Sequence, residues 1–213
     1  MNTTTEPERD VVVLTGTIGS GKTAVGKILS ALGANVVHAD TLAHEVIAKG
    51  SPGYDEVVSR FGAAVLLPNG EIDRKALGRI VFDDVQERKA LERIVHPRVR
   101  RLSEDRFRQG LKSGAPLVVY ECPLFFESGL DSQPFRAVVT VVADEPLCIE
   151  RICKRDSLTQ AEATARLRQQ LSAAEKSKRS SFVIENNGTE QELETEVRKL
   201  WPRLIAPETR PRR

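Results

Sequence analysis

Residues 16–23 of this chain read GTIGSGKT. They match G-x-x-x-x-G-K-[ST] at every fixed position, the pattern of the phosphate-binding loop (P-loop) of nucleoside triphosphate-binding proteins. The apolar, β-branched run at 11–15 before the loop predicts a buried strand. Apolar residues at 25, 28, 29 and 32 follow the loop at the spacing of one helix face, and Gly33 is a typical helix stop. The order of strand, glycine loop and helix favours a phosphate cradle over a glycine-rich turn that binds nothing.

The residue types of the loop predict its chemistry. Glycines let the backbone turn successive N–H groups towards phosphate oxygens, and the N-terminus of the following helix adds positive potential. Lys22 is expected to reach the β- and γ-phosphates, and the Thr23 hydroxyl is expected to ligate magnesium. The candidate ATP-binding residues here are Gly19, Ser20, Gly21, Lys22, Thr23 and Ala24.

Composition excludes several classes of protein. The 213 residues suffice for one α/β domain with insertions, and aromatic residues make up only 5%, so the core should be aliphatic. The 32 basic and 30 acidic residues give a net charge of +2, too balanced to indicate a nucleic-acid or membrane surface. We also expect no signal peptide or membrane span, and the three cysteines are expected to be reduced thiols of a cytoplasmic protein.

Short apolar runs alternate with helical stretches along the chain. Four further strands are expected, at 35–38, 117–121, 137–143 and 181–185. This alternation predicts a three-layer α/β fold with a five-stranded, mostly parallel sheet and helices on both faces. The nucleotide-binding core is expected to comprise 9–40 and 114–205, with flexible tails at 1–8 and 206–213. A capping box at 189–192 should open the last helix.

The connection between the second and third strands is unusually long. Residues 41–113 suggest several helices, at 41–49, 54–61, 74–82 and 85–110. A βαβ unit needs only about 30 residues, so the excess predicts a helical insertion. Ligands of open α/β sheets bind at the carboxyl ends of the strands, which places the insertion where a second substrate would bind.

Basic residues gather in a second region, the lid segment (150–179). Residues 151–179 hold eight Lys or Arg against three acidic residues, on what we expect to be two helices interrupted near 156–159. A solvated amphipathic helix pair is the plain interpretation of such a charge run. Because a triphosphate site needs cationic help at the γ-phosphate, a mobile lid is the better hypothesis.

Two carboxylates and one histidine are candidates for the chemistry. Asp40, expected to end the second strand, can accept a proton from an attacking hydroxyl, or it can serve as the N-cap of the next helix. Glu121, at the end of the third strand, can lie near magnesium or can be a surface carboxylate. His96, in the insertion, is assigned to the architecture of the substrate site.

The motifs together resemble the dephospho-coenzyme A kinase family. The resemblance spans about residues 11–201. Besides the P-loop it rests on segments that read VHAD at 37–40, IDRKAL at 72–77, LERIVHP at 91–97 and PLFFE at 123–127, on the basic residues of the lid segment with Gln170, and on VIENNG at 183–188. The chain differs from the family at His38, where Asp is usual, at Glu121, where Asp is common, and at 180–182.

The resemblance implies a reaction and its parts. The γ-phosphoryl group of ATP would pass, with Mg²⁺, to the ribose 3′-hydroxyl of dephospho-coenzyme A, and the enzyme would be a monomer or a small homo-oligomer. Asp40 would be the base, Lys22 the phosphate ligand, Arg155 the lid cation, and Asn187 would lie near the adenine. Acceptor-side candidates are Asp40, His96, Pro97, Leu124 and Glu127; metal candidates are Thr23 and Glu121.

Two other functions share some of these features. A kinase of another small hydroxyl compound or of a nucleoside monophosphate has the same core and lid, but the long insertion argues against it. A nucleotide switch or regulatory ATPase would need a partner surface, and the sequence contains no exposed apolar run or recognisable switch segment. Dependence of ATP turnover on the acceptor separates these possibilities.

Overall fold

The computed structural model describes residues 7–206. They divide into two compact units at the Val37–His38 and Arg106–Phe107 junctions. The core unit contains the described residues up to Val37 and from Phe107 onwards, and the insertion unit is His38–Arg106. Each unit is described by itself.

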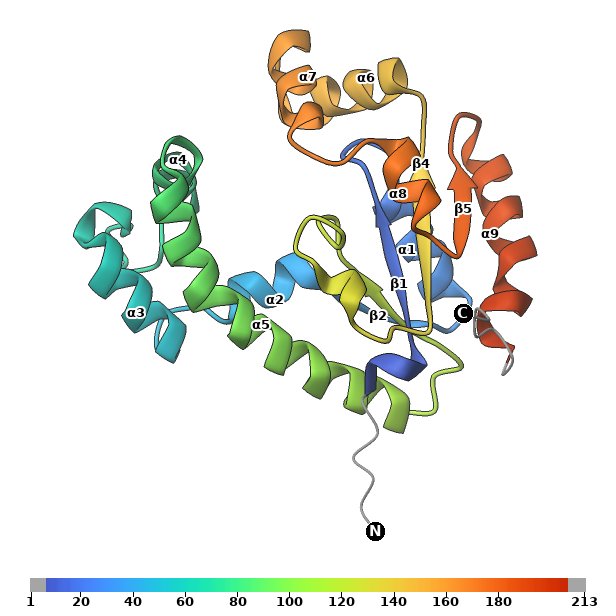
Figure 1. Cartoon of the computed structure of the whole chain (residues 1–213), viewed down its shortest axis with the longest axis horizontal. Coiled ribbons are helices and arrows are strands. Elements are labelled where there is room, and N and C mark those ends of the chain that lie inside the picture. The colour runs from blue at the N-terminus through green and yellow to red at the C-terminus, as the bar shows by residue number, and fades with distance from the viewer. Residues whose placement is uncertain (1–6, 207–213) are drawn as a thin grey trace. The chain divides into compact units, whose positions relative to one another are not determined.

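A five-stranded sheet forms the centre of the core unit (Figure 1). Its strands are, in chain order, β1 (Val11–Gly16), β2 (Asn35–His38), β3 (Val118–Glu121), β4 (Ala137–Val142) and β5 (Phe182–Glu185). The spatial order is β2-β3-β1-β4-β5, and β1 pairs in parallel with both β3 and β4, as β4 does with β5. All five predicted strands are confirmed to within one residue.

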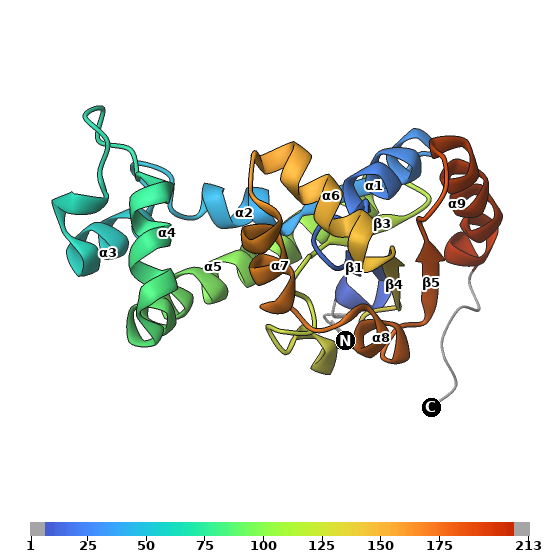
Figure 2. The ribbon, with the colours of Figure 1, turned by 90° about the horizontal axis from the view of Figure 1, so that it is seen from above.

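The central strand β1 is buried along its whole length. It therefore contributes alternate side chains to both faces of the sheet. Val12 and Leu14 join the core formed with α1 (Lys22–Ala31) and α9 (Glu190–Ile205). Figure 2 shows these two helices together on one side of the strands and α8 (Ala173–Lys178) on the other.

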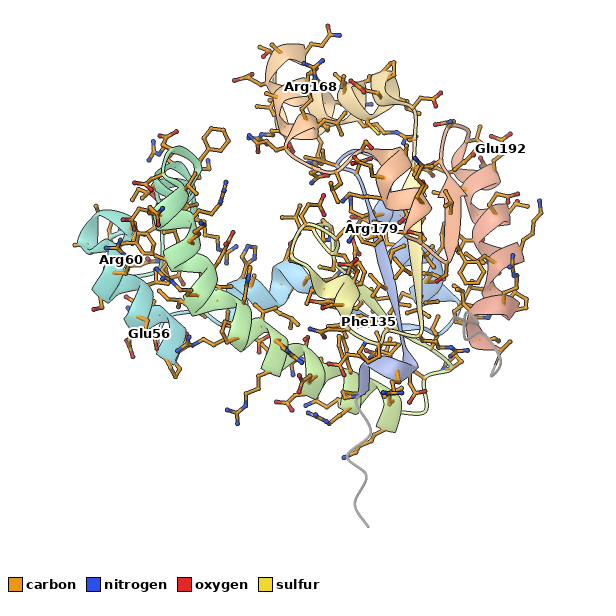
Figure 3. The ribbon with its side chains drawn as sticks, viewed as in Figure 1. Glu56, Arg60, Phe135, Arg168, Arg179 and Glu192 are labelled. Carbon is orange, nitrogen blue, oxygen red and sulfur yellow. The ribbon has the colours of Figure 1, made fainter. Side chains whose placement is uncertain are left out.

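The opposite face holds a cluster of aromatic side chains. Phe107, near the end of α5 (Val85–Lys112), meets Tyr120 of β3 edge-on, with ring centroids 5.1 Å apart. Phe135, labelled in Figure 3, stacks on Tyr120 at 6.1 Å and meets Phe125 edge-on at 5.4 Å. Helices thus cover both faces, as the sequence predicted.

The insertion unit is helical. It comprises α2 (Ala39–Glu45), α3 (Pro52–Phe61), the 3₁₀ turn η2 (Ala63–Val65), α4 (Arg74–Asp83) and the part of α5 up to Arg106. Ser51 caps α3 and Asp73 caps α4, each accepting hydrogen bonds from backbone N–H groups of the first turn. The unit has a core of its own: Val46, Ile47, Val57, Val65, Ile72 and Leu77.

The lid segment consists of three helices, where the sequence predicted two. They are α6 (Glu145–Asp156), α7 (Gln160–Arg168) and α8. Ser157, in the left-handed region at φ 55°, ends α6, and capping boxes at Thr159 and Ser172 open the next two helices. The second box opens a third helix that the sequence analysis does not include, and Lys176 lies on it. The predicted box at Thr189 is confirmed, and its Glu192 is labelled in Figure 3.

The chain ends differ in part from the predicted flexible tails, 1–8 and 206–213. Pro7 and Glu8 are buried in the 3₁₀ helix η1 (Pro7–Asp10), so the prediction is wrong there. Arg136 donates a hydrogen bond to the Ala206 carbonyl. The rest of both tails lies outside the described residues. Among helices within residues 7–206, none has the length and hydropathy to cross a bilayer.

Candidate active site

The P-loop connects β1 to α1 and depends on glycines at its tightest points. Gly19 and Gly21 have φ of 80° and 97°, values that residues with a Cβ rarely adopt. A Cβ on Gly19 would lie 2.6 Å from the Cys148 carbonyl oxygen, and one on Gly21 would lie 2.1 Å from Asn186 Nδ2. The loop therefore needs these glycines both for its curl and for the groups packed behind it.

Lys22 is held at the mouth of the loop. Its Nζ donates a hydrogen bond of 2.8 Å to the Thr17 carbonyl oxygen, and the residue is only 8% exposed. Thr17 and Ser20 are buried as well. The ammonium group is thus held beside the loop backbone, where it can bind an anion that enters the loop.

Thr23 and Glu121 form an oxygen-rich corner behind the loop. Thr23 Oγ1 donates to Glu121 Oε1 at 3.4 Å, and Glu121 is buried at the end of β3. Gly26 leaves room for this carboxylate, because a Cβ there would lie 3.0 Å from Glu121 Oε2. Glu121 is therefore a buried group beside the loop, not a surface carboxylate.

Three side chains hold the outer side of the loop, and none was among the predicted site residues. Gln170 Oε1 accepts from Ile18 N at 2.9 Å. Arg151 Nη1 donates to the Gly19 carbonyl at 3.4 Å and its Nη2 to the Asn186 carbonyl at 3.1 Å. Asn186 Nδ2 donates to the Ser20 carbonyl at 2.8 Å. All three residues are in the resembling segments, but only the fold shows that they meet the loop.

Asn187, predicted to lie near the adenine, pairs with Asp144. The Asp144 amide donates to Asn187 Oδ1 at 2.8 Å, and Asn187 Nδ2 donates to Asp144 Oδ1 at 3.0 Å. This pair joins the end of β5 to the start of α6. The preceding residue, Asn186, contacts the P-loop itself.

Arg155 of α6 is bound to its neighbour Asp156. Its Nε donates to Asp156 Oδ1 at 2.7 Å and its Nη2 to Oδ2 at 2.9 Å, while Arg166 Nη1 reaches Oδ2 at 3.2 Å. The hydrogen bonds from Arg155 are the main reason that the pKa of Asp156 lies below its usual value. The ionised Asp156 carboxylate thus binds two arginines of the lid segment. The Arg155 side chain is 61% exposed.

Glu127, predicted on the acceptor side, binds the base of the lid segment. Its Oε1 accepts from Leu171 N at 2.9 Å, and Lys176 Nζ lies 2.9 Å from the same oxygen. Lys176 also donates to the Pro123 carbonyl at 2.9 Å. We call the Glu127–Lys176 pair the lid anchor. Leu124, its predicted companion, is 49% exposed.

The cysteines are free thiols: Cys122, Cys148 and Cys153. Cys148 lies behind Gly19. Burial raises the pKa of the Cys148 thiol, so this cysteine is protonated at neutral pH. Its position is that of a packing residue.

In the insertion unit, Asp40 lies in the first turn of α2. His38 is the N-cap and β2 ends there, so the N-cap alternative for Asp40 is wrong, as is the expectation that it ends the strand. Asp40 is exposed. His96 and Pro97 are exposed on α5, and Pro97 lies inside that helix without ending it.

His44 lies one turn after Asp40 and contacts Arg74 of α4. Arg74 Nη1 and His44 Nδ1 are 2.9 Å apart. Burial lowers the pKa of His44, the Arg74 guanidinium lowers it further, and the Asp40 carboxylate partly opposes both effects. A neutral imidazole can therefore accept the hydrogen bond from Arg74 at neutral pH.

Arg74 also lines a hollow of about 580 Å³ in the insertion unit. Its walls are apolar at Ile47, Leu67 and Ile72 and basic at Lys49, Arg74 and Lys75. Glu71 and Asp73 are acidic residues of the same wall. The hollow suits a ligand that has both apolar and anionic parts.

A model of the dephospho-CoA kinase family matches residues 10–192. This chain belongs to the dephospho-CoA kinase family. The dephospho-CoA kinase of Geobacter sulfurreducens is 42% identical over 192 residues, which cover 90% of this chain and 97% of that protein. The dephospho-CoA kinase of Anaeromyxobacter dehalogenans is 44% identical over 183 residues, 86% of each chain.

Solved structures similar to this chain include a member of the same family. The dephospho-CoA kinase of Campylobacter jejuni is 30% identical, with a TM-score of 0.69 over 92% of this chain and 97% of that one. A Thermus thermophilus protein reaches a TM-score of 0.78 at 34% identity, over 91% of this chain and 97% of that one. Shikimate kinase of Acinetobacter baumannii, at 16% identity and a TM-score of 0.51 over 93% of this chain and 94% of that one, shares the fold. The predicted family and the P-loop kinase fold are confirmed.

Proposed function

We propose that this chain transfers the γ-phosphoryl group of ATP to the ribose 3′-hydroxyl of dephospho-CoA, giving CoA and ADP. The complete P-loop, with Lys22 against the Thr17 carbonyl and Thr23 beside a buried Glu121, supports ATP as the donor. The observation that supports the acceptor is the match of residues 10–192 to the dephospho-CoA kinase family. Phosphoryl transfer asks a protein mainly for alignment and charge stabilisation. A loop of this kind supplies both to the donor.

On the donor side, Lys22 binds the β- and γ-phosphates and the loop amides of residues 19–24 surround them. Arg155 is the cation that joins from the lid segment. Its exposed guanidinium leaves Asp156 and binds phosphate oxygens, because a triphosphate offers more negative charge than one carboxylate. Asn187, beside the loop-bound Asn186, lies on the adenine side.

Magnesium fits the Thr23–Glu121 corner. Mg²⁺ prefers oxygen ligands and keeps waters and substrate phosphates among them. The Thr23 hydroxyl and the Glu121 carboxylate, 3.4 Å apart, are such ligands, and the carboxylate can bind the ion directly or through water. When bound, Mg²⁺ neutralises charge on the transferred phosphoryl group. Glu121 keeps the carboxylate that the family more often provides as Asp.

Asp40 is the general base of the proposed reaction. It is an exposed carboxylate two residues after the end of β2, and it matches the last residue of the family's Asp-Ala-Asp segment. The first of those carboxylates is His38 here, so Asp40 carries the proton-accepting role alone. The base takes the proton of the attacking 3′-hydroxyl as the new P–O bond forms.

The insertion unit is the acceptor-binding part, predicted at 41–113. Its hollow offers apolar walls for the pantetheine arm and Lys49, Arg74 and Lys75 for the diphosphate of dephospho-CoA. His96, Pro97, Leu124 and Glu127 are further acceptor-side candidates from the resemblance. Glu127 is the least suited of them, because the lid anchor already engages its carboxylate.

We also place the enzyme in the cytoplasm, as a monomer or a small homo-oligomer. Three free thiols suit a reducing compartment, in which they stay unpaired. Light scattering of the purified chain measures the oligomeric state.

An ADP-release assay tests the proposed reaction. ATP and Mg²⁺ are supplied with dephospho-CoA, or with adenosine or nucleoside monophosphates as acceptor controls. Turnover with dephospho-CoA alone supports the proposal. Equal turnover without any acceptor would identify an ATPase, and turnover with a monophosphate would identify a nucleotide kinase.

A further inference from the structure

The lid segment touches the P-loop between α7 and α8, through a side chain that the proposed reaction does not use. Gln170 follows α7, and its Oε1 accepts a hydrogen bond of 2.9 Å from the Ile18 amide. The two residues are 152 positions apart in the chain. The bond therefore joins two elements that only the fold brings together.

The Thr17–Ile18 peptide group is held from both sides. Its N–H, on Ile18, donates to Gln170, and its C=O, on Thr17, accepts from Lys22 Nζ at 2.8 Å. A trans peptide is planar, with its N–H and C=O pointing in opposite directions. Rotation of this plane would break both hydrogen bonds together, so the orientation that satisfies Gln170 is also the one that holds Lys22.

Gln170 is itself fixed by the lid anchor. The next residue, Leu171, donates its backbone N–H to Glu127 at 2.9 Å, and Glu127 is paired with the fully buried Lys176. Arg179, labelled in Figure 3, lies over the Phe126 ring at 4.6 Å from its centroid and strengthens the same junction. Gln170 therefore moves with the part of the lid segment that the lid anchor holds.

The other side-chain contacts to the loop are made to different peptide groups. Arg151 and Asn186 bind the carbonyls of Gly19 and Ser20. The hydrogen bond from Lys22 Nζ at 2.8 Å goes to the Thr17 carbonyl, in the peptide whose N–H is bound by Gln170. Gln170 is distinguished because its partner peptide also holds the phosphate-binding lysine.

We propose that Gln170 is a positioning residue for ATP: it orients Lys22 through the Thr17–Ile18 peptide and so couples the lid segment to the phosphate site. The inference rests on the proposed function in one respect, that ATP is the donor bound at the loop. Displacement of the segment around Gln170 removes the acceptor of Ile18. The peptide is then held only at its C=O, by Lys22 Nζ and by the Ser20 N–H at 3.2 Å, so its orientation is less restricted and Lys22 is held less firmly.

The test uses Gln170→Met, which keeps the size of the side chain and removes the acceptor oxygen. A net hydrogen bond corresponds to roughly a two- to tenfold change in an equilibrium constant. We expect the dissociation constant of ATP·Mg²⁺, measured by calorimetry without acceptor, to rise by that factor, and exchange of the Ile18 amide to accelerate similarly. The KM of dephospho-CoA should stay within twofold. General destabilisation would not weaken ATP binding while leaving the acceptor KM unchanged.

Gln169→Met is the matched control, because Gln169 is the exposed neighbour of the same residue type. It should change neither quantity. Gln170→Glu retains an acceptor oxygen, so slow exchange of the Ile18 amide should persist. Gln170→Asn, one methylene too short to reach, should behave like Gln170→Met and replaces it if that variant does not fold.

Three results would overturn the proposal: unchanged Ile18 exchange in Gln170→Met, faster exchange with unchanged ATP affinity, or an equal rise in the acceptor KM. ATP binding and amide exchange are measured without acceptor. A failure of the proposed reaction is therefore distinguishable from a failure of this inference.

Discussion

Replacing Lys176 by methionine removes a fully buried cation from the lid anchor. The side chain is 0% exposed, and its Nζ lies 2.9 Å from both the Pro123 carbonyl and Glu127 Oε1. Methionine preserves the apolar stem, so packing changes little. The effect is confined to the charge and its hydrogen bonds.

The expected loss follows from the partners left behind. A hydrogen bond to a charged group contributes about 1.5–3 kcal/mol. Truncating one member of a fully buried ion pair costs about 3–5 kcal/mol, but here the loss is smaller for two reasons. Glu127 keeps the Leu171 N–H and its side chain is 19% exposed, and the Pro123 carbonyl keeps the Thr15 hydroxyl at 3.3 Å. We expect about 2–3 kcal/mol, or roughly 4–12 °C in Tm for a chain of this size.

Urea denaturation followed by circular dichroism measures this loss. Lys178→Met, an exposed lysine of the same helix, is the control and should stay within about 0.5 kcal/mol. A double-mutant cycle with Glu127→Gln should give a coupling of at least about 1 kcal/mol. A loss for Lys176→Met no larger than that of Lys178→Met would refute the lid anchor as a stabilising contact.

Asp40→Asn should lower kcat by about 10²–10⁴-fold, the usual contribution of a general base, with ATP affinity unchanged; near-wild-type turnover would remove Asp40 from that role. Arg155→Ala should lower kcat on the order of 10³-fold and leave the KM of dephospho-CoA and the Tm nearly unchanged, since the side chain is 61% exposed. A rise in that KM with unchanged kcat would move Arg155 to the acceptor site. Gly21→Ala should abolish ATP binding in calorimetry, because φ is 97° and the new Cβ would lie 2.1 Å from Asn186 Nδ2; retained affinity would show that the loop adapts.

The elements with strong local patterns were predictable. The P-loop, its strand and its helix follow from residues 11–33, because hydrophobic periodicity and glycine spacing are local properties. The capping box at Thr189 was recognised for the same reason. The box at Ser172 has the same pattern but precedes no long apolar run, so the local sequence does not predict the third lid helix.

Contacts between distant residues were not predictable. Gln170 meets Ile18 across 152 positions, and Asn186 meets Ser20 across 166. Nothing in the local sequence indicates which polar side chain will face which backbone group. Glu127 was predicted on the acceptor side for a similar reason, since its pairing with Lys176 arises only when α8 meets the loop that follows β3.

The predicted boundary between β2 and α2 was wrong for a local reason. The backbone of His38 is extended, at φ −99° and ψ 116°, and the helix begins at Ala39. The apolar run of β2 gave no sign that the helix would start before the carboxylate. Asp40 therefore lies within the first turn, where a carboxylate is favoured by the helix dipole.

The most direct test of the proposed function identifies the product. Purified enzyme is incubated with ATP, Mg²⁺ and dephospho-CoA, and the acceptor is analysed by mass spectrometry and by digestion with a 3′-nucleotidase. We expect one added phosphoryl group that the 3′-nucleotidase removes, formed in equal amount to ADP. ADP release with an unmodified acceptor, or a phosphoryl group resistant to that enzyme, would contradict it.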